Sequence, residues 1–389
     1  MANTQKYQVH NPEIGALPTS KSPLIKQMPN ECRFVDFINQ DLKPQHRNES
    51  KNIWTAVELF EPQIIAQIEP FLLARALCPK SLESAMLRSI CDDNTKAVNK
   101  LLDAGVTIER LKQFQFPWLH VCALNNSPES LSLLLERHAN INDVDHDGKT
   151  PLHIAAQYDR HSLLPIFESH NECDVNAVDN RGNTPILTAA IFQAWDFVLK
   201  LSDNIGTDIN FANDTNLDVL TLAIKAKQNK LINKLILHPN IQPRDKHLKT
   251  AVYSNNLYAL KTLLATSDEL LSPKLNAELL NIAASRNFRP IIRALLEQGI
   301  NVNSKDINGN TAIHTACLYS HLDLVTDLLA TPNLNLTIRN RKDQSPLAIA
   351  NQTYDKHLKM NINGFQQDPH LDSAKRILIK LSEFVKSVY

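Results

Sequence analysis

The sequence lacks an excess of charge of either sign, because 41 Lys and Arg residues balance 41 Asp and Glu residues. This balance gives no electrostatic reason to expect a nucleic acid or an anionic membrane as the partner. No window contains the roughly 18 consecutive apolar residues of a membrane span. The opening residues MANTQKYQVH lack the apolar run of a secretory signal. We therefore expect a cytoplasmic protein that binds no nucleic acid and has no membrane span.

Paired cysteines and known catalytic motifs are also missing. The six cysteines stand at positions 32, 78, 91, 122, 173 and 317, and none belongs to a CxxC pair. This scatter fits free thiols in a reducing compartment better than a disulfide framework or a zinc site. The sequence has no P-loop, dinucleotide fingerprint, HExxH motif or EF-hand loop. We therefore predict no metal, no cofactor and no enzymatic activity.

Glycine is scarce, with 8 in the chain, and three of them belong to a phrase that returns. The phrase reads DHDGKTPLHIAAQYDR at 145–160, NRGNTPILTAAIFQAW at 180–195, INGNTAIHTACLYSHL at 307–322 and RKDQSPLAIANQTY at 341–354. Thr150 and Thr184 are 34 residues apart, as are Thr311 and Ser345. A fixed period of this length indicates a stack of repeated units.

The chemistry of the phrase predicts how each unit folds. Thr150 can cap a helix with its hydroxyl, and Pro151 suits the first helical position, where its missing N–H matters little. Ala155 and Ala156 let a neighbouring helix approach closely, and His153 can hydrogen-bond back toward the cap. A second apolar run and an Asp-, Asn- and Gly-rich turn follow. One unit is therefore helix, turn, helix and β-turn finger, and it buries its apolar faces only by stacking on copies.

This pattern resembles the ankyrin repeat, whose signature is a G-x-TPLHxAA opening, a second helix ending near LLxxGA, and a VN or IN before the finger. The match is strong at 147–180 and 308–340, good at 181–213, and degenerate but in phase elsewhere. The resemblance implies an all-α ankyrin-repeat solenoid of about nine helix-turn-helix units with β-turn fingers. Cys122 and Cys317 take small buried positions of the phrase, and His120, His153 and His314 take its histidine position.

Three segments follow from this reading. Residues 1–50 are polar and without periodicity, so we expect them to be loosely ordered. Residues 51–83 form amphipathic helices that we interpret as an N-terminal helical cap, or else as a small partner-binding module. Residues 84–389 form the repeat array, in which the last unit carries an insertion at 354–370 before a capping helix at about 373–388.

The resemblance also implies where a partner protein binds, since ankyrin proteins use finger tips and the exposed faces of first helices along a concave groove. Tyr158, Phe192 and Tyr319 place an aromatic at one equivalent groove position, where they serve as interface anchors or are covered by the N-terminal segment. The positions carried over are Asp147, Lys149, Arg181, Asn183, Asn308 and Asn310 in fingers, and Gln157, Tyr158, Ile191, Phe192, Leu318 and Tyr319 in helices.

The leading prediction for function is a monomeric, non-enzymatic scaffold that binds a protein partner in this groove. One alternative is an adaptor that recruits a second protein, such as a ubiquitin-ligase component, through residues 1–80; residues 27–42 faintly resemble the opening of an F-box. Another is a cryptic enzyme that uses Cys32, outside the repeats. The Asn- and Lys-rich, Gly-poor composition is similar to that of ankyrin-repeat effectors of intracellular bacteria, which implies delivery into a host cell and a host protein as the partner.

Overall fold

The computed structural model describes residues 79–108, 110–111, 116–204, 206–266, 272–362 and 369–388. The chain divides into two compact units, with the boundary between His146 and Asp147. Residues 1–78 lie outside the described part, so the segment predicted at 1–50 and the part of the predicted cap (51–83) that lies within 51–78 stay predictions. So do the adaptor segment and Cys32.

The first unit contains two helical hairpins. Its helices are α6 (Pro79–Cys91), α7 (Thr95–Asp103), α8 (Trp118–Asn125) and α9 (Pro128–Glu136). A two-residue antiparallel ladder, β1 (Arg110–Leu111) with β2 (Phe116–Pro117), lies between α7 and α8. Trp118 is wholly buried and its indole Nε1 donates to the Thr107 carbonyl at 2.9 Å. Helix α6 begins at Pro79, within the segment 51–83 that the sequence predicts as the cap, and packs on α7.

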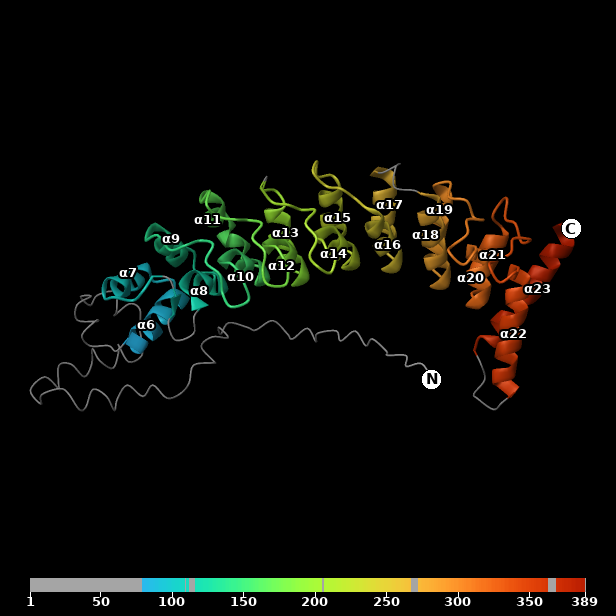
Figure 1. The fold of residues 1–389 in the computed structure, drawn as a ribbon, viewed down its shortest axis with the longest axis horizontal. Helices are drawn as coiled ribbons and strands as arrows, with labels where there is room; N and C mark the ends of the chain where they lie inside the picture. Colours follow the sequence, from blue (N-terminus) through green and yellow to red (C-terminus); the bar gives the residue numbers. More distant parts are fainter. Residues whose placement is uncertain are drawn as a thin grey trace, which may run out of the picture. The chain divides into compact units, whose positions relative to one another are not determined.

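The second unit stacks seven further helix pairs, and Figure 1 shows their first and second helices in two rows. The first helices are α10 (Pro151–Gln157), α12 (Pro185–Ile191), α14 (Val219–Lys225), α16 (Asp245–Tyr253), α18 (Pro273–Ser285), α20 (Ala312–Leu318) and α22 (Pro346–Ile362). The second helices are α11 (Leu164–Ser169), preceded by the 3-10 turn η2 (His161–Leu163), then α13 (Trp195–Leu201), α15 (Asn229–Ile236), α17 (Leu257–Thr266), α19 (Arg289–Glu297), α21 (Leu322–Leu329) and α23 (Leu371–Val388). Each first helix contacts the next along its row.

The cap chemistry predicted for the phrase is confirmed. The Thr150 hydroxyl accepts the His153 N–H, and His153 Nδ1 accepts the Thr150 N–H at 3.1 Å. Because Nδ1 is an acceptor, Nε2 carries the proton, and it donates to the Asn183 carbonyl of the next repeat at 2.9 Å. Thr311 and His314 repeat this arrangement. One histidine therefore closes its own helix cap and fastens the neighbouring finger.

The core consists of the small and aliphatic positions of the phrase. Ala155, Ala156 and Cys122 are fully buried, and Cys317 is 1% exposed, as the two-alanine pattern predicts. These short side chains let consecutive first helices pack closely. With two pairs in the first unit and seven in the second, the described chain has the nine helix pairs expected from the sequence, and the all-α fold class is confirmed apart from the short β1–β2 ladder.

The last repeat departs from the prediction. Residues 354–362, expected to begin an insertion, instead continue α22, which has 17 residues where α10, α12, α14 and α20 each have 7. The segment has no glycine or proline before Gly364, so nothing local stops the helix. The capping helix predicted at about 373–388 is observed as α23 and packs on α22 and α21.

Candidate partner-binding face

The fingers of the second unit are held by side-chain hydrogen bonds to their own backbone. Asp179 Oδ1 accepts the N–H groups of Arg181 (2.9 Å) and Asn183 (2.8 Å). Asp306 Oδ1 does the same for Asn308 and Asn310, both at 2.8 Å. These bonds fix each turn without help from its neighbours, and they leave the Arg181 and Asn308 side chains exposed at the finger tips.

Neighbouring fingers are also joined to one another. The Asn180 N–H donates to the Asp147 carbonyl and the Arg341 N–H donates to the Asn308 carbonyl, both at 2.9 Å. At these two junctions the neighbouring fingers are therefore joined by backbone hydrogen bonds. The finger surface is formed before a partner binds, so binding does not have to order it.

Asn183, one of the residues predicted to contact a partner, is buried and not exposed. Asn183 is only 6% exposed, because its side chain belongs to a ladder of amides between fingers. Its Oδ1 accepts from Asn213 Nδ2 at 2.9 Å, and its Nδ2 donates to Asp179. Asn310 makes the equivalent contact in its own repeat, where its Oδ1 accepts from Asn340 Nδ2 at 2.9 Å, and it is half-buried. Both amides hold the fingers together.

The remaining polar positions of the predicted site are partly exposed. Lys149 is turned along its own repeat, where Nζ donates to Gln157 Oε1 at 2.9 Å and lies 3.8 Å from Asp147 Oδ2. The Lys149 side chain is only 14% exposed as a result. Asp147, Lys149 and Gln157 thus form one polar cluster next to Tyr158 in the sequence. Only the outer atoms of this cluster can contact a partner.

Large apolar side chains recur at the ends of the first helices. Tyr158, Phe192 and Tyr319 are the C-cap residues of α10, α12 and α20, and Ile191 and Leu318 precede two of them. Their exposed fractions are 37% for Tyr158, 39% for Ile191, 51% for Phe192, 52% for Leu318 and 51% for Tyr319. The exposure predicted for the three aromatics is observed, and no described segment covers them.

Sequence reasoning missed one member of this set. Tyr253 is the last residue of α16, in the register of Ile191 and Leu318, and is 47% exposed. The guanidinium of Arg286 lies over its ring, 5.0 Å from the centroid, and Arg286 Nη1 donates to the Tyr253 carbonyl at 3.1 Å. Such a cation–π pair holds the ring in one orientation. The sequence signal that could have located it is Asn255, two residues later. Asn255 has a positive φ, as does Gln193, two residues after Ile191.

We call Tyr158, Ile191, Phe192, Tyr253, Leu318 and Tyr319 the first-helix stripe. It is interrupted at α14, whose corresponding residues are Lys225 and Ala226, and again at α18, where they are Ser285 and Arg286. Of the three middle repeats in which the sequence predicts an interruption, only α16 carries a large apolar side chain at this register, Tyr253.

The described cysteines are poor nucleophiles. Burial raises the pKa of Cys91 and of Cys173 to about 11, with the nearby carboxylates of Asp92 and Asp174 adding to the effect. Burial also raises the pKa of Cys122 and Cys317, far above the ordinary thiol value for Cys122. A protonated thiol neither attacks a carbonyl nor binds a metal readily. Among the residues that the structure describes, no three His, Cys, Asp or Glu side chains gather as a metal site would require.

The comparisons with known proteins agree with this architecture. The family model described as ankyrin repeats (3 copies) matches residues 86–172, 119–213 and 248–340, more than half of the chain in all. The chain belongs to the ankyrin-repeat family. In the described part, no helix combines the length and the apolar character needed to cross a membrane.

Similar proteins share the repeats within much longer chains. Rabankyrin-5 of Mus musculus is 37% identical over 71 residues, which is 18% of this chain and 6% of the relative. A putative ankyrin repeat protein, L371, of Acanthamoeba polyphaga mimivirus is 21% identical over 210 residues, 51% of this chain and 28% of the relative. The E3 ubiquitin-protein ligase KEG of Arabidopsis thaliana is 22% identical over 297 residues, 68% of this chain and 18% of the relative. The matches thus span less than a third of each relative, and ankyrin repeats indicate a scaffold for protein–protein interaction.

Proposed function

We propose that the second unit binds a partner protein through the first-helix stripe and the finger tips, with no catalytic step of its own. The observation that carries the proposal is the recurrence of exposed Tyr, Phe, Ile and Leu side chains at one register in the repeats of α10, α12, α16 and α20. Isolated exposed apolar residues are common, but a periodic series at the ends of stacked helices is typical of an interaction surface.

The arrangement supplies both parts of a protein interface. The stripe offers aromatic anchors whose burial contributes most of the binding energy. Arg181 and Asn308 at the finger tips supply a polar rim. Because the fingers are already hydrogen-bonded, association orders few additional residues in the scaffold.

A capture experiment with the full chain tests this function. Bait proteins are the unmodified chain, the double variant Phe192→Ala/Tyr319→Ala, and the control Leu237→Ala. Leu237 is 69% exposed and is the C-cap residue of the second helix α15, outside the stripe. We expect mass spectrometry to find a protein retained by the unmodified chain and by the control, and lost by the double variant. Equal retention by all three baits contradicts the proposal.

The adaptor alternative is tested by adding a further bait that lacks residues 1–78. A protein that stays bound to the double variant but is lost when residues 1–78 are deleted supports recruitment through the N-terminal segment. Recovery of the same protein from a host-cell lysate, and not from a bacterial lysate, would favour the effector origin predicted from composition.

A further inference from the structure

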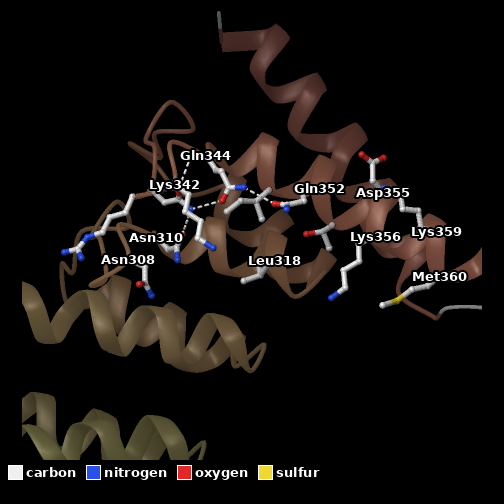
Figure 2. A pocket seen from close by; sticks show the side chains of 14 residues that line it. Asn308, Asn310, Leu318, Lys342, Gln344, Gln352, Asp355, Lys356, Lys359 and Met360 are labelled. Carbon is white, nitrogen blue, oxygen red and sulfur yellow. Dashed lines mark hydrogen bonds between the residues drawn. The ribbon is translucent and has the colours of Figure 1, made fainter. Parts of the chain in front are cut away.

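The extension of α22 encloses a hollow at the C-terminal end of the second unit. The hollow has a volume of about 1000 Å³ and lies between the fingers at 308–310 and 340–344 and the second half of α22. Figure 2 shows Lys342 and Asn308 on the finger side, Lys356 and Met360 on the α22 side, and Leu318 between them. We call this hollow the α22 pocket. The extra turns of α22 form its wall, and the shorter first helices of the other repeats have no equivalent.

The wall and the finger carry an excess of positive charge. Arg341, Lys342, Lys356 and Lys359 line the α22 pocket, against one acidic residue, Asp355. Figure 2 shows the Asp355 carboxylate and the Lys356 ammonium pointing in opposite directions. Within the described residues, the four cationic side chains have no ion pair. Arg339 and Arg376, by contrast, pair with Asp343 at 2.9 Å and with Asp372 at 2.8 Å.

Apolar side chains also line the α22 pocket. Leu318 is 52% exposed and Met360 is 45% exposed, and both face the hollow. Lys356 and Met360 are four residues apart on α22, so their side chains lie on the same side of the helix. Gln344 Nε2 donates to Gln352 Oε1 at 2.9 Å and ties the finger to the helix, so the two sides of the hollow are held in place. Leu318 also belongs to the first-helix stripe, and the pocket is therefore continuous with it.

We propose that the α22 pocket binds an acidic segment of a partner protein, in which carboxylates flank a large apolar side chain. This inference rests on the proposed function and identifies the chemistry of one part of the partner. The apolar side chain contacts Leu318 and Met360, while the carboxylates pair with Lys342, Lys356 and Lys359. Charge pairs at a rim of this kind increase the association rate and select among partners.

A nucleic acid fits the pocket less well. Single strands bind to sheets and grooves that offer aromatic rings for base stacking together with cations. The described residues that line the α22 pocket include no aromatic side chain. The combination of cations with aliphatic side chains and amides matches an acidic amphipathic peptide.

The test uses the full chain and a displayed library of random 12-residue peptides. Selection is carried out on the unmodified chain, on Lys356→Glu/Lys359→Glu and on Lys375→Glu/Lys380→Glu. The last pair makes the same charge change on α23, in the same repeat and outside the pocket. Circular dichroism checks that each variant is folded. Enriched peptides are then measured by fluorescence anisotropy, beside a single-stranded DNA of 12 nucleotides.

We expect the enriched peptides to contain several Asp or Glu residues around a Leu, Ile, Met or Phe. The α22 variant should bind them at least about tenfold more weakly, and the α23 variant should bind them as the unmodified chain does. Raising the salt concentration from about 50 to about 300 mM should weaken binding to the unmodified chain, because exposed charge pairs are screened.

Four results would overturn the proposal: no enrichment of acidic peptides, equal binding by the α22 variant, equal weakening in the α23 variant, or tighter binding of the DNA. Peptides that are lost with Phe192→Ala but kept by the α22 variant would leave the proposed function in place and remove only the pocket from it.

Discussion

At the residue scale, the repeats vary one hydrogen-bonding scheme. Asp218 replaces the capping threonine at the start of α14, and its Oδ1 accepts the Thr221 N–H at 2.7 Å. His247 Nε2 donates to the same carboxylate at 2.9 Å, and the Lys246 ammonium also contacts it. Burial alone raises the pKa of Asp218, but the hydrogen bond and charge of His247 together with the Lys246 contact hold that pKa well below its ordinary value.

Replacing this carboxylate should reduce stability. Asp218→Ala removes the cap and leaves buried donors of Thr221 and His247 unsatisfied, so we expect a loss of about 2–4 kcal/mol of unfolding free energy. Asp218→Thr restores the acceptor found at Thr150 and Thr184, and it should recover the part that comes from the cap. Urea unfolding near pH 6 measures both, and equal losses for the two variants would show that capping contributes nothing.

The lowered pKa of Asp218 predicts that the stability of the fold depends on pH. Since the folded pKa of Asp218 is lowered, its charge stabilises the fold above the ordinary carboxyl pKa of about 4. That stability is lost as pH falls below this value toward the folded pKa. The difference in unfolding free energy between the unmodified chain and Asp218→Thr should therefore shrink between about pH 5 and pH 3. A constant difference over this range would contradict the role of the charge.

Thiol reactivity should follow burial. Cys122 and Cys317 are at most 1% exposed and burial raises their pKa values, so a maleimide at about pH 7 should label them only after the chain unfolds. Mass spectrometry of native and urea-treated protein locates the labelled cysteines. Native labelling of Cys317 at the rate of the unfolded chain would contradict the buried position. A Cys32 that reacts much faster than an unfolded-chain thiol would favour the enzyme alternative.

At the element scale, α23 covers the end of the last repeat with one apolar face, while its other face is exposed. Ile377 is 1% exposed and Ile379, on the same helix, is 46% exposed. Ile377→Asp places an unpaired carboxylate at a buried position of α23 and should lower the unfolding free energy by about 3 kcal/mol or more, with aggregation. Ile379→Asp should change it by about 0.5 kcal/mol or less. Equal effects of the two variants on the melting temperature would refute the assignment of α23 as a cap.

Element positions could be read from the sequence wherever the phrase persists. Thr150, Pro151 and His153 locate a helix start through cap chemistry, which acts within four residues and needs no tertiary information. The end of α22 could not be placed in this way. The helix continues past the usual length because its polar segment contains no helix breaker, whereas the length of the other repeats suggested an insertion. The α22 pocket was missed for the same reason.

Exposure was harder to predict than position. Asn183 and Arg181 are both finger residues, yet the first is buried in an amide ladder with Asn213, 30 residues away, and the second is exposed. Such a contact depends on how two repeats stack. Tyr253 was missed because α16 has nine residues, which shifts the phrase relative to its neighbours.

At the scale of the whole molecule, the stripe, the fingers and the α22 pocket all belong to the second unit. In a repeat stack each unit contacts only its neighbours, so exposed residues at one register can change without altering the fold. Function and stability are therefore separable at these positions, in contrast to Ala155 or His153, whose buried contacts serve the stack itself.

The most direct measurement compares the unfolding free energy and the partner affinity of Phe192→Ala, with Leu237→Ala as the control and the captured protein as ligand. Phe192 is 51% exposed, so its truncation should change stability by about 0.5 kcal/mol or less. Affinity should fall by about 2 kcal/mol, roughly 30-fold, while the control leaves it unchanged. A large drop in melting temperature would show that the ring belongs to the core, and unchanged affinity with unchanged stability would show that the partner binds elsewhere.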